Sequence, residues 1–230
     1  MREELINRTT YSTSKALEIY SVSYLWPYEV VLLDSYLKAG MKVLDIGCGT
    51  GRSTRFIAER GGQVVGIDMV EAFISKGKEL YPDLDLRVMN ATRLDFPDQS
   101  FDLVLFSNQG IDYTDRREVV IQEACRVLRS HGIFAYSAHN SLSWPRTRKA
   151  WRNFFLNFRS WRFGYHFRVE HHPNGDLHVA HNNVWAEIRL LQRVGFRVIE
   201  ILSNHSRFSS WPKLLVGLFT RWPLYVCRKN

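Results

Sequence analysis

The stretch Lys42-Val43-Leu44-Asp45-Ile46-Gly47-Cys48-Gly49-Thr50-Gly51 decides the fold of this chain. Its first five residues form a short apolar run, which is typical of a buried strand in a parallel sheet. Three glycines follow at alternate positions, where the missing side chains let backbone N–H groups and a helix N-terminus approach a ligand closely. The order of strand, glycine loop and helix predicts an α/β fold with a ligand at the end of this strand.

Short apolar strands and amphipathic helices alternate around this stretch. The predicted strands cover residues 42–46, 63–67, 84–89, 101–106, 132–137, 196–202 and 224–227. The predicted helices cover residues 29–38, 51–60, 70–80, 115–128 and 184–194. Such alternation indicates a doubly wound, Rossmann-like sheet of parallel strands with helices on both faces. We expect a single domain over residues 1–230, with an N-terminal helical segment over residues 1–40.

The alternation breaks between residues 141 and 182 and then restarts, which indicates an insertion within one domain. Aromatic side chains of the insertion, Trp151 and Phe155 among them, fall on one face of a predicted helix over residues 145–163, with arginines toward the other. This pattern predicts a helical cap that covers a ligand pocket. A solvated basic face, a peripheral membrane contact and an RNA contact stay open as alternatives.

Composition limits the class of protein. The 230 residues are 45% hydrophobic and carry a net charge of +8, which is enough apolar material for a core and favours an anionic partner of some kind. The three cysteines are far apart and form no CxxC pair, so neither a disulfide framework nor a zinc site is indicated. Five histidines between residues 166 and 181 lack the accompanying ligand spacing, and we predict no metal. Without a secretory signal pattern, we expect a cytoplasmic protein.

Polar residues follow the predicted strands at the edge of the sheet where ligands bind. An acid, Asp68, follows the second strand and can accept hydrogen bonds from both hydroxyls of a ribose. A nicotinamide dehydrogenase would share these features, but its fingerprint needs a third glycine where this chain has Arg52.

The segment over residues 43–140 resembles the class I S-adenosylmethionine-dependent methyltransferases. Val43-Leu44-Asp45-Ile46-Gly47-Cys48-Gly49-Thr50-Gly51 is similar to the first motif of that family, and Gly66-Ile67-Asp68 is similar to its second. Phe96-Pro97-Asp98-Gln99-Ser100-Phe101-Asp102 resembles the approach to its fourth strand. Cys125-Arg126-Val127-Leu128-Arg129-Ser130-His131-Gly132 resembles the approach to its fifth. The resemblance implies a seven-stranded sheet whose last strand runs antiparallel between its neighbours.

The resemblance also implies that S-adenosyl-L-methionine is the cofactor. Position by position, it assigns cofactor binding to Asp45, Gly47, Cys48, Gly49, Gly51, Asp68, Met69, Asn90, Ala91, Ser107 and Asn108. Asp45 would order the glycine loop, and Asp68 would bind the ribose, with Met69 against the adenine. Many relatives carry aspartate at the position of Asn90, where an amide oxygen can still accept a hydrogen bond from the adenine amino group.

The sequence says less about the methyl acceptor than about the cofactor. His139 follows the fifth strand and is the candidate general base for a hydroxyl acceptor. Tyr113, Trp151 and Phe155 are candidate acceptor contacts. The family's signature for methylating nucleobase amino groups is absent, since Ser107-Asn108-Gln109-Gly110 stands in its place. We therefore predict methylation of a small molecule, with oxygen slightly preferred. An RNA methyltransferase and a cofactor-binding protein without transfer activity are the alternatives.

Overall fold

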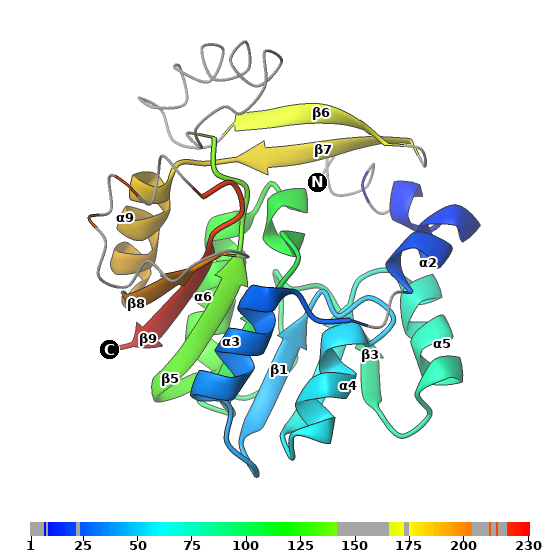
Figure 1. Cartoon of the computed structure of the whole chain (residues 1–230), viewed down its shortest axis with the longest axis horizontal. Coiled ribbons are helices and arrows are strands. Elements are labelled where there is room, and N and C mark those ends of the chain that lie inside the picture. The colour runs from blue at the N-terminus through cyan, green and yellow to red at the C-terminus, as the bar shows by residue number, and fades with distance from the viewer. Residues whose placement is uncertain are drawn as a thin grey trace.

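A single seven-stranded sheet forms the centre of the computed structural model, which describes residues 7, 9–21, 24–141, 166–172, 175–203, 212, 215 and 220–230 (Figure 1). The strand order is β3-β2-β1-β4-β5-β9-β8. The strands of this sheet are β1 (Lys42–Ile46), β2 (Gln63–Asp68), β3 (Asp85–Val88), β4 (Phe101–Phe106), β5 (Leu128–Ser137), β8 (Phe196–Leu202) and β9 (Leu224–Lys229). The first five pair in parallel, whereas β9 runs antiparallel to both β5 and β8. The expected mostly parallel sheet with its inserted last strand is confirmed.

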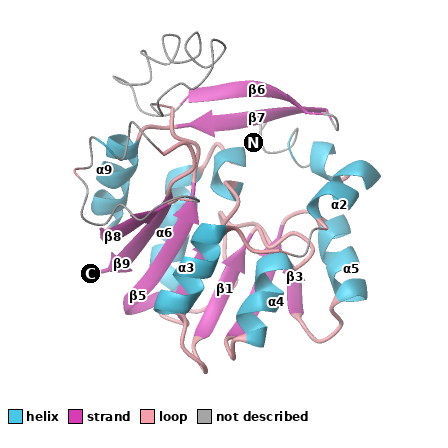
Figure 2. Cartoon of the chain, in the orientation of Figure 1, coloured by secondary structure: helices cyan, strands magenta, loops and turns pink. Residues whose placement is uncertain are grey.

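Helices cover both faces of this sheet (Figure 2). The described helices are α2 (Ser14–Tyr20), α3 (Pro27–Tyr36), α4 (Arg52–Glu59), α5 (Glu71–Leu80), the 3-10 turn η1 (Gly110–Tyr113), α6 (Arg117–Val127) and α9 (Val184–Val194). Alternate residues of a strand point to opposite faces, so Val43 packs with α3 and α4 while Leu44 packs with α6 and α9. This two-sided burial is why the strands read as continuous apolar runs.

The direction of the chain through the sheet creates a crevice. From β1 the chain moves outward through β2 to β3, and then returns to β4 on the other side of β1. The loops that follow β1 and β4 therefore diverge at the carboxyl ends of these two strands. In open α/β sheets this switch point is where ligands bind.

The described part of the insertion is a β-hairpin, which the sequence analysis did not predict. β6 (His166–His172) and β7 (Gly175–His181) pair in antiparallel register and lie across the carboxyl ends of the sheet strands (Figure 1). The predicted helix over residues 145–163, with Trp151 and Phe155, lies outside the described residues. An Asn-Gly pair at residues 174 and 175 was the sequence signal for this hairpin.

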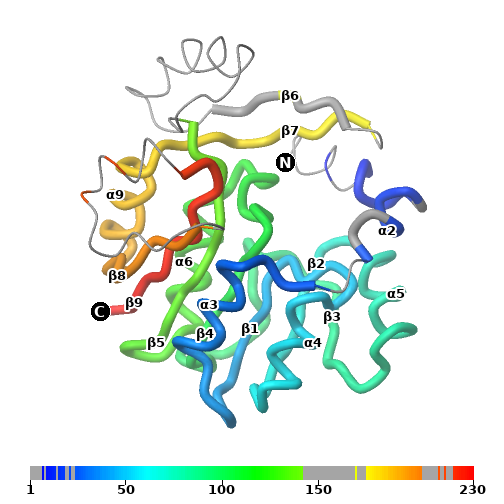
Figure 3. Tube along the Cα trace, viewed as in Figure 1, coloured from blue at the N-terminus to red at the C-terminus, as the bar shows by residue number. Residues whose placement is uncertain are grey.

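Hydrogen bonds join the N-terminal segment to this hairpin and to η1, and α2 of this segment lies beside α5 (Figure 3). The buried side-chain amide of Asn7 donates to the carbonyl oxygens of Tyr113 (2.9 Å) and His178 (2.8 Å). Its oxygen accepts the backbone N–H of His178 at 2.8 Å. The side chain of Asn7 thereby joins the N-terminal segment to η1 and to β7. These elements lie over the carboxyl end of the sheet.

Candidate functional site

A cavity of about 340 Å³ opens at the carboxyl ends of β1, β2 and β4. This volume is in the range of small-molecule and cofactor sites. Ten of the residues predicted from sequence line it: Gly47, Cys48, Gly49, Asp68, Met69, Asn90, Ala91, Ser107, Asn108 and Tyr113. They come from the ends of four strands and from η1, so the fold brings together residues that are far apart in the sequence.

Asp45 and Gly51 lie behind the cavity wall rather than in it. The carboxylate of Asp45 accepts hydrogen bonds from the hydroxyls of Ser53 and Thr54, both at 2.7 Å. These contacts tie the first turn of α4 to β1 across the glycine loop. Gly51 has a φ of 90° and immediately precedes α4, a backbone conformation that glycine adopts without strain.

The position of Asp68 links the glycine loop to the start of α5. Its carboxylate accepts backbone N–H groups of Gly49 at 3.0 Å and Val70 at 2.8 Å. Burial raises the pKa of Asp68, and these backbone hydrogen bonds oppose the rise. A carboxylate has about four lone-pair sites, so it can still accept hydrogen bonds from a ligand that carries two neighbouring hydroxyls.

Asn90 follows β3 and forms a local turn. Its side-chain oxygen accepts both the backbone N–H and the hydroxyl of Thr92, each at 2.9 Å. These two hydrogen bonds occupy the atom that the sequence analysis expected to accept from adenine. The side-chain oxygen of Asn90 thus stabilises the turn after β3, at a position that lines the cavity.

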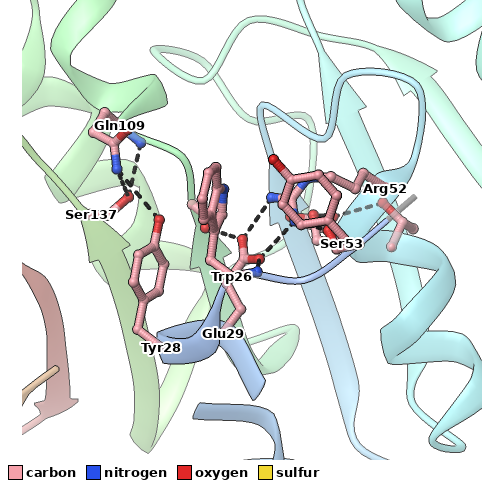
Figure 4. Close-up of polar contacts among 11 residues, drawn as sticks. Trp26, Tyr28, Glu29, Arg52, Ser53, Gln109 and Ser137 are labelled. Atoms are coloured by element: carbon pink, nitrogen blue, oxygen red, sulfur yellow. Dashed lines mark hydrogen bonds and ion pairs between the residues drawn. The ribbon is translucent and has the colours of Figure 1, made fainter. Parts of the chain in front are cut away.

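A buried ion pair beside the glycine loop was missed in the sequence analysis (Figure 4). The guanidinium of Arg52, in the first turn of α4, contacts both carboxylate oxygens of Glu29 in α3, at 2.6 and 2.7 Å. Arg52 also donates to the carbonyl oxygen of Tyr24 at 2.8 Å. Glu29 accepts the backbone N–H of Trp26 at 2.7 Å and the hydroxyl of Ser107. Four segments around the cavity are joined at this one carboxylate–guanidinium pair.

The turn after β4 has an unusual backbone. Asn108 and Gln109 have φ values of 53° and 57°, a left-handed conformation that costs energy in residues other than glycine. Ser137 at the end of β5 holds the turn, since its hydroxyl oxygen accepts the backbone N–H of Gln109 at 2.8 Å. Tyr28 lies beside it with a pKa raised to about 12 by burial and, next, by the charge of Glu29. These hydroxyl groups hold the turn that carries Asn108, which lines the cavity.

His139 lies behind the wall of the cavity. Its Nδ1 atom lies 2.7 Å from Asp112 Oδ2, and its backbone N–H donates to the same oxygen at 2.6 Å. Asp112 also forms an ion pair with the fully buried Arg117, which in turn pairs with Glu187 of α9. Tyr113 from the same turn is among the described residues that line the cavity, but His139 is not. The His139 ring instead neighbours that of His181, at 4.9 Å between centroids.

The titration of Asp45 should be visible in the stability of the protein. Burial raises its pKa to about 6, against the hydrogen bonds from Thr54 and Ser53 and the charge of Arg52. The folded protein therefore binds a proton more tightly than the unfolded chain, and this group's contribution to stability falls as pH rises from about 4 to about 6.

Titration of Asp45 should lower the free energy of unfolding of the wild type by about 2–3 kcal/mol over this pH range, since two pKa units correspond to about that energy. Asparagine does not titrate, so we expect this decrease to be absent in Asp45→Asn. Urea unfolding of both proteins at pH 4.5 and pH 7 measures the difference. Other titrating groups cancel between the two proteins. Parallel pH profiles would contradict the assignment.

Within the described part of the chain, no helix is long and apolar enough to cross a bilayer. Within the same residues, no group of three or more histidine, cysteine, aspartate or glutamate side chains could hold a metal ion.

Known proteins resemble this chain in sequence over about half of its length and in fold over most of its length. Residues 44–136 match the family described as a methyltransferase domain. The chain is 34% identical over 107 residues to a demethylmenaquinone methyltransferase from Beutenbergia cavernae, covering 46% of this chain and 44% of that protein. It is 32% identical over 124 residues to a malonyl-(acyl-carrier protein) O-methyltransferase from Hamiltonella defensa, covering 50% and 48%. The chain thus spans less than half the length of either relative.

A solved structure shares the fold over most of the chain. It is a 1,6-didemethyltoxoflavin-N1-methyltransferase from Burkholderia thailandensis, with S-adenosylhomocysteine bound. The TM-score is 0.60 at 18% identity, and the match covers 89% of this chain and 77% of that one. The glycine loop, the acid after β2 and the seven-stranded sheet agree with these matches, and the segment over residues 44–136 is similar to the methyltransferase-domain family.

Proposed function

We propose that this chain transfers the methyl group of S-adenosylmethionine to a small-molecule acceptor. The observation that carries the proposal is the cavity itself, which gathers the glycine loop, Asp68, Met69 and Asn108 at the switch point of the sheet. When bound, the cofactor supplies a methyl group on a positively charged sulfur, already activated for in-line displacement. The protein's own residues then have to bind and align the two reactants and to exclude water, which can account for most of the rate enhancement.

Asp68 provides the test of cofactor binding. Asp68→Ala should weaken the binding of S-adenosylhomocysteine by about 10- to 100-fold, because hydrogen bonds to a charged group are worth about 1.5–3 kcal/mol. Isothermal titration calorimetry measures it directly. Asp34, an exposed carboxylate paired with Arg60, provides the control in Asp34→Ala, whose affinity should match that of the wild type. Equal affinities for all three proteins would refute the assigned role.

We further propose an oxygen acceptor that extends beyond the described cavity lining to within hydrogen-bond reach of His139, the base that takes its proton. Support comes from the contact between Nδ1 and Asp112, which fixes the ring and would stabilise the imidazolium that forms on proton uptake. A mass-spectrometric search of cell extract for a metabolite that gains one methyl would supply the acceptor.

With that acceptor, His139→Gln should lower kcat by about 100-fold, within the range for general bases. Its affinity for S-adenosylhomocysteine should stay within about twofold, because His139 lies outside the described cavity wall. An unchanged kcat would exclude the base, and would favour an acceptor atom that loses no proton in the rate-limiting step.

The names of the relatives support a small molecule or a carried acyl group rather than a polymer, and they do not favour one acceptor atom. We also propose a reducing, cytoplasmic setting, since Cys48, Cys125 and Cys227 are all unpaired thiols.

A further inference from the structure

The pair formed by Glu29 and Arg52 is a buried charge contact beside the cavity, which Arg52 lines. The side chain of Glu29 is 0% exposed and that of Arg52 is 10% exposed. Both carboxylate oxygens meet the guanidinium, the two-pronged geometry that arginine offers and lysine does not. Burying two charges costs solvation energy, which only a complete set of partners offsets. The pair is therefore intolerant of partial loss.

Two hydrogen-bond partners of this ion pair come from the segment over residues 24–26, which forms part of the cavity wall. The carbonyl oxygen of Tyr24 accepts from Arg52, and the backbone N–H of Trp26 donates to Glu29. The two aromatic rings pack edge to face with centroids 5.2 Å apart, and both line the cavity. Figure 4 shows Trp26, Glu29 and Arg52 converging in this way. This aromatic wall is thus fastened at both of its ends by the same ion pair.

Through Glu29 the wall is tied to the loop after β4, which lies on the other side of β1 from Asp68. Asp68 ends β2, whereas Ser107, which donates to Glu29, follows β4, and β1 lies between these two strands. A cofactor whose ribose is held at Asp68 and whose adenine lies toward β3 would extend its amino-acid end past the glycine loop to this wall. Tyr24 lines the cavity and keeps 46% of its surface exposed, so its side chain lies at the boundary between the cavity and solvent.

We propose that the Glu29–Arg52 pair holds the Tyr24–Trp26 wall closed over the amino-acid end of the cofactor and so sets how fast the cofactor leaves. This inference rests on the proposed function, since it assumes that the cavity binds S-adenosylmethionine. Glu29 and Arg52 act here as positioning residues: they hold backbone groups of the wall. Closure of this kind affects the dissociation rate more than the association rate, because it stabilises the bound state after entry.

The experiment measures association and dissociation of S-adenosylhomocysteine on immobilised protein by surface plasmon resonance. The variants are Arg52→Lys, which keeps the charge but loses the two-pronged contact, and Glu29→Gln. Arg55 provides the matched control in Arg55→Lys, because it lies on the same helix and pairs with Glu59 at 2.6 Å in solvent. Such an exposed pair contributes little. A fourth variant, Tyr24→Ala, removes the aromatic ring of the wall and keeps the backbone carbonyl that Arg52 binds.

We expect dissociation at least 10-fold faster for Arg52→Lys, Glu29→Gln and Tyr24→Ala, with association within about threefold and the control unchanged. Circular dichroism at the assay temperature identifies the variants that are folded. If Glu29→Gln fails to fold, Arg52→Lys still tests the ion pair, and Tyr24→Ala, which leaves the pair in place, tests the wall that the pair holds. Dissociation rates within twofold of wild type in the folded variants overturn the inference and leave the proposed function standing. No binding by the wild type overturns both.

Discussion

Replacing Arg117 with methionine is expected to lower the free energy of unfolding by about 3–5 kcal/mol. Arg117 is 1% exposed and is the cation between two buried carboxylates, those of Asp112 and Glu187. Methionine has a similar length but no charge, so both carboxylates would stay buried without their cation. Removing one partner of a buried ion pair costs about this much.

Helices α6 and α9, which carry Arg117 and Glu187, also provide a control for this change. Arg193 of α9 and Glu118 of α6 also form an ion pair, at 4.0 Å, with side chains 65% and 53% exposed. Arg193→Met should change the stability by well under 1 kcal/mol, as exposed pairs do. Urea unfolding compares both variants with the wild type. A loss for Arg117→Met no larger than that for Arg193→Met would mean that this buried cluster contributes nothing to the fold.

Alanine at Gly47 should destabilise the protein more than alanine at Gly49, the next glycine of the loop. Gly47 has a φ of 63°, and an added Cβ would lie 2.6 Å from Cε2 of Phe106. The Phe106 ring cannot move aside easily, because it also lies against Gly110, where an added Cβ would come even closer. Gly47→Ala therefore combines backbone strain with overpacking, and we expect a loss of about 2–4 kcal/mol in stability.

Alanine at Gly49 separates backbone strain from overpacking. Its φ of 58° imposes similar backbone strain, but an added Cβ would meet nothing within 4 Å. Gly49→Ala should therefore cost only about 1 kcal/mol in stability. Because Gly49 lines the cavity, its new methyl group would instead weaken S-adenosylhomocysteine binding, which calorimetry measures. Equal losses of stability in the two variants would show that Phe106 accommodates the methyl group at Gly47.

The glycine loop and Asp68 could be predicted because each depends on a local pattern. Alternating glycines after an apolar strand specify a backbone shape, and an acid at the end of the next parallel strand must lie beside them. The antiparallel β9 was predicted only through the family resemblance, because a short apolar run carries no information about its direction.

The contacts of Arg52 could not be predicted in this way. In the sequence it stands out only as the residue in place of a third glycine. Its partner Glu29 lies in a preceding helix, and no periodicity links the two positions. The same holds for His139, whose side chain is held by Asp112 from a different turn. Side-chain pairs of this kind follow from tertiary packing, which a single sequence does not reveal.

The hairpin of β6 and β7 was missed for another reason. Its residues are largely charged or imidazole-bearing, and strand propensity is weak in such a composition. Its position depends on contacts with the N-terminal segment, such as the hydrogen bond from Thr10 to the carbonyl oxygen of Asp176 at 3.1 Å.

The placement of β9 between β5 and β8 governs the order in which the sheet can assemble. Among the described strands, β8 pairs only with β9, and Ile133 of β5 lies opposite Arg228. While the nascent chain is being made, β1 to β5 can associate early, but β5 keeps an open edge and β8 has nothing to pair with until residues 224–229 emerge from the ribosome. Pairings so distant along the chain form slowly. The exposed flank of β5 is therefore where premature self-association of the newly made polypeptide would begin.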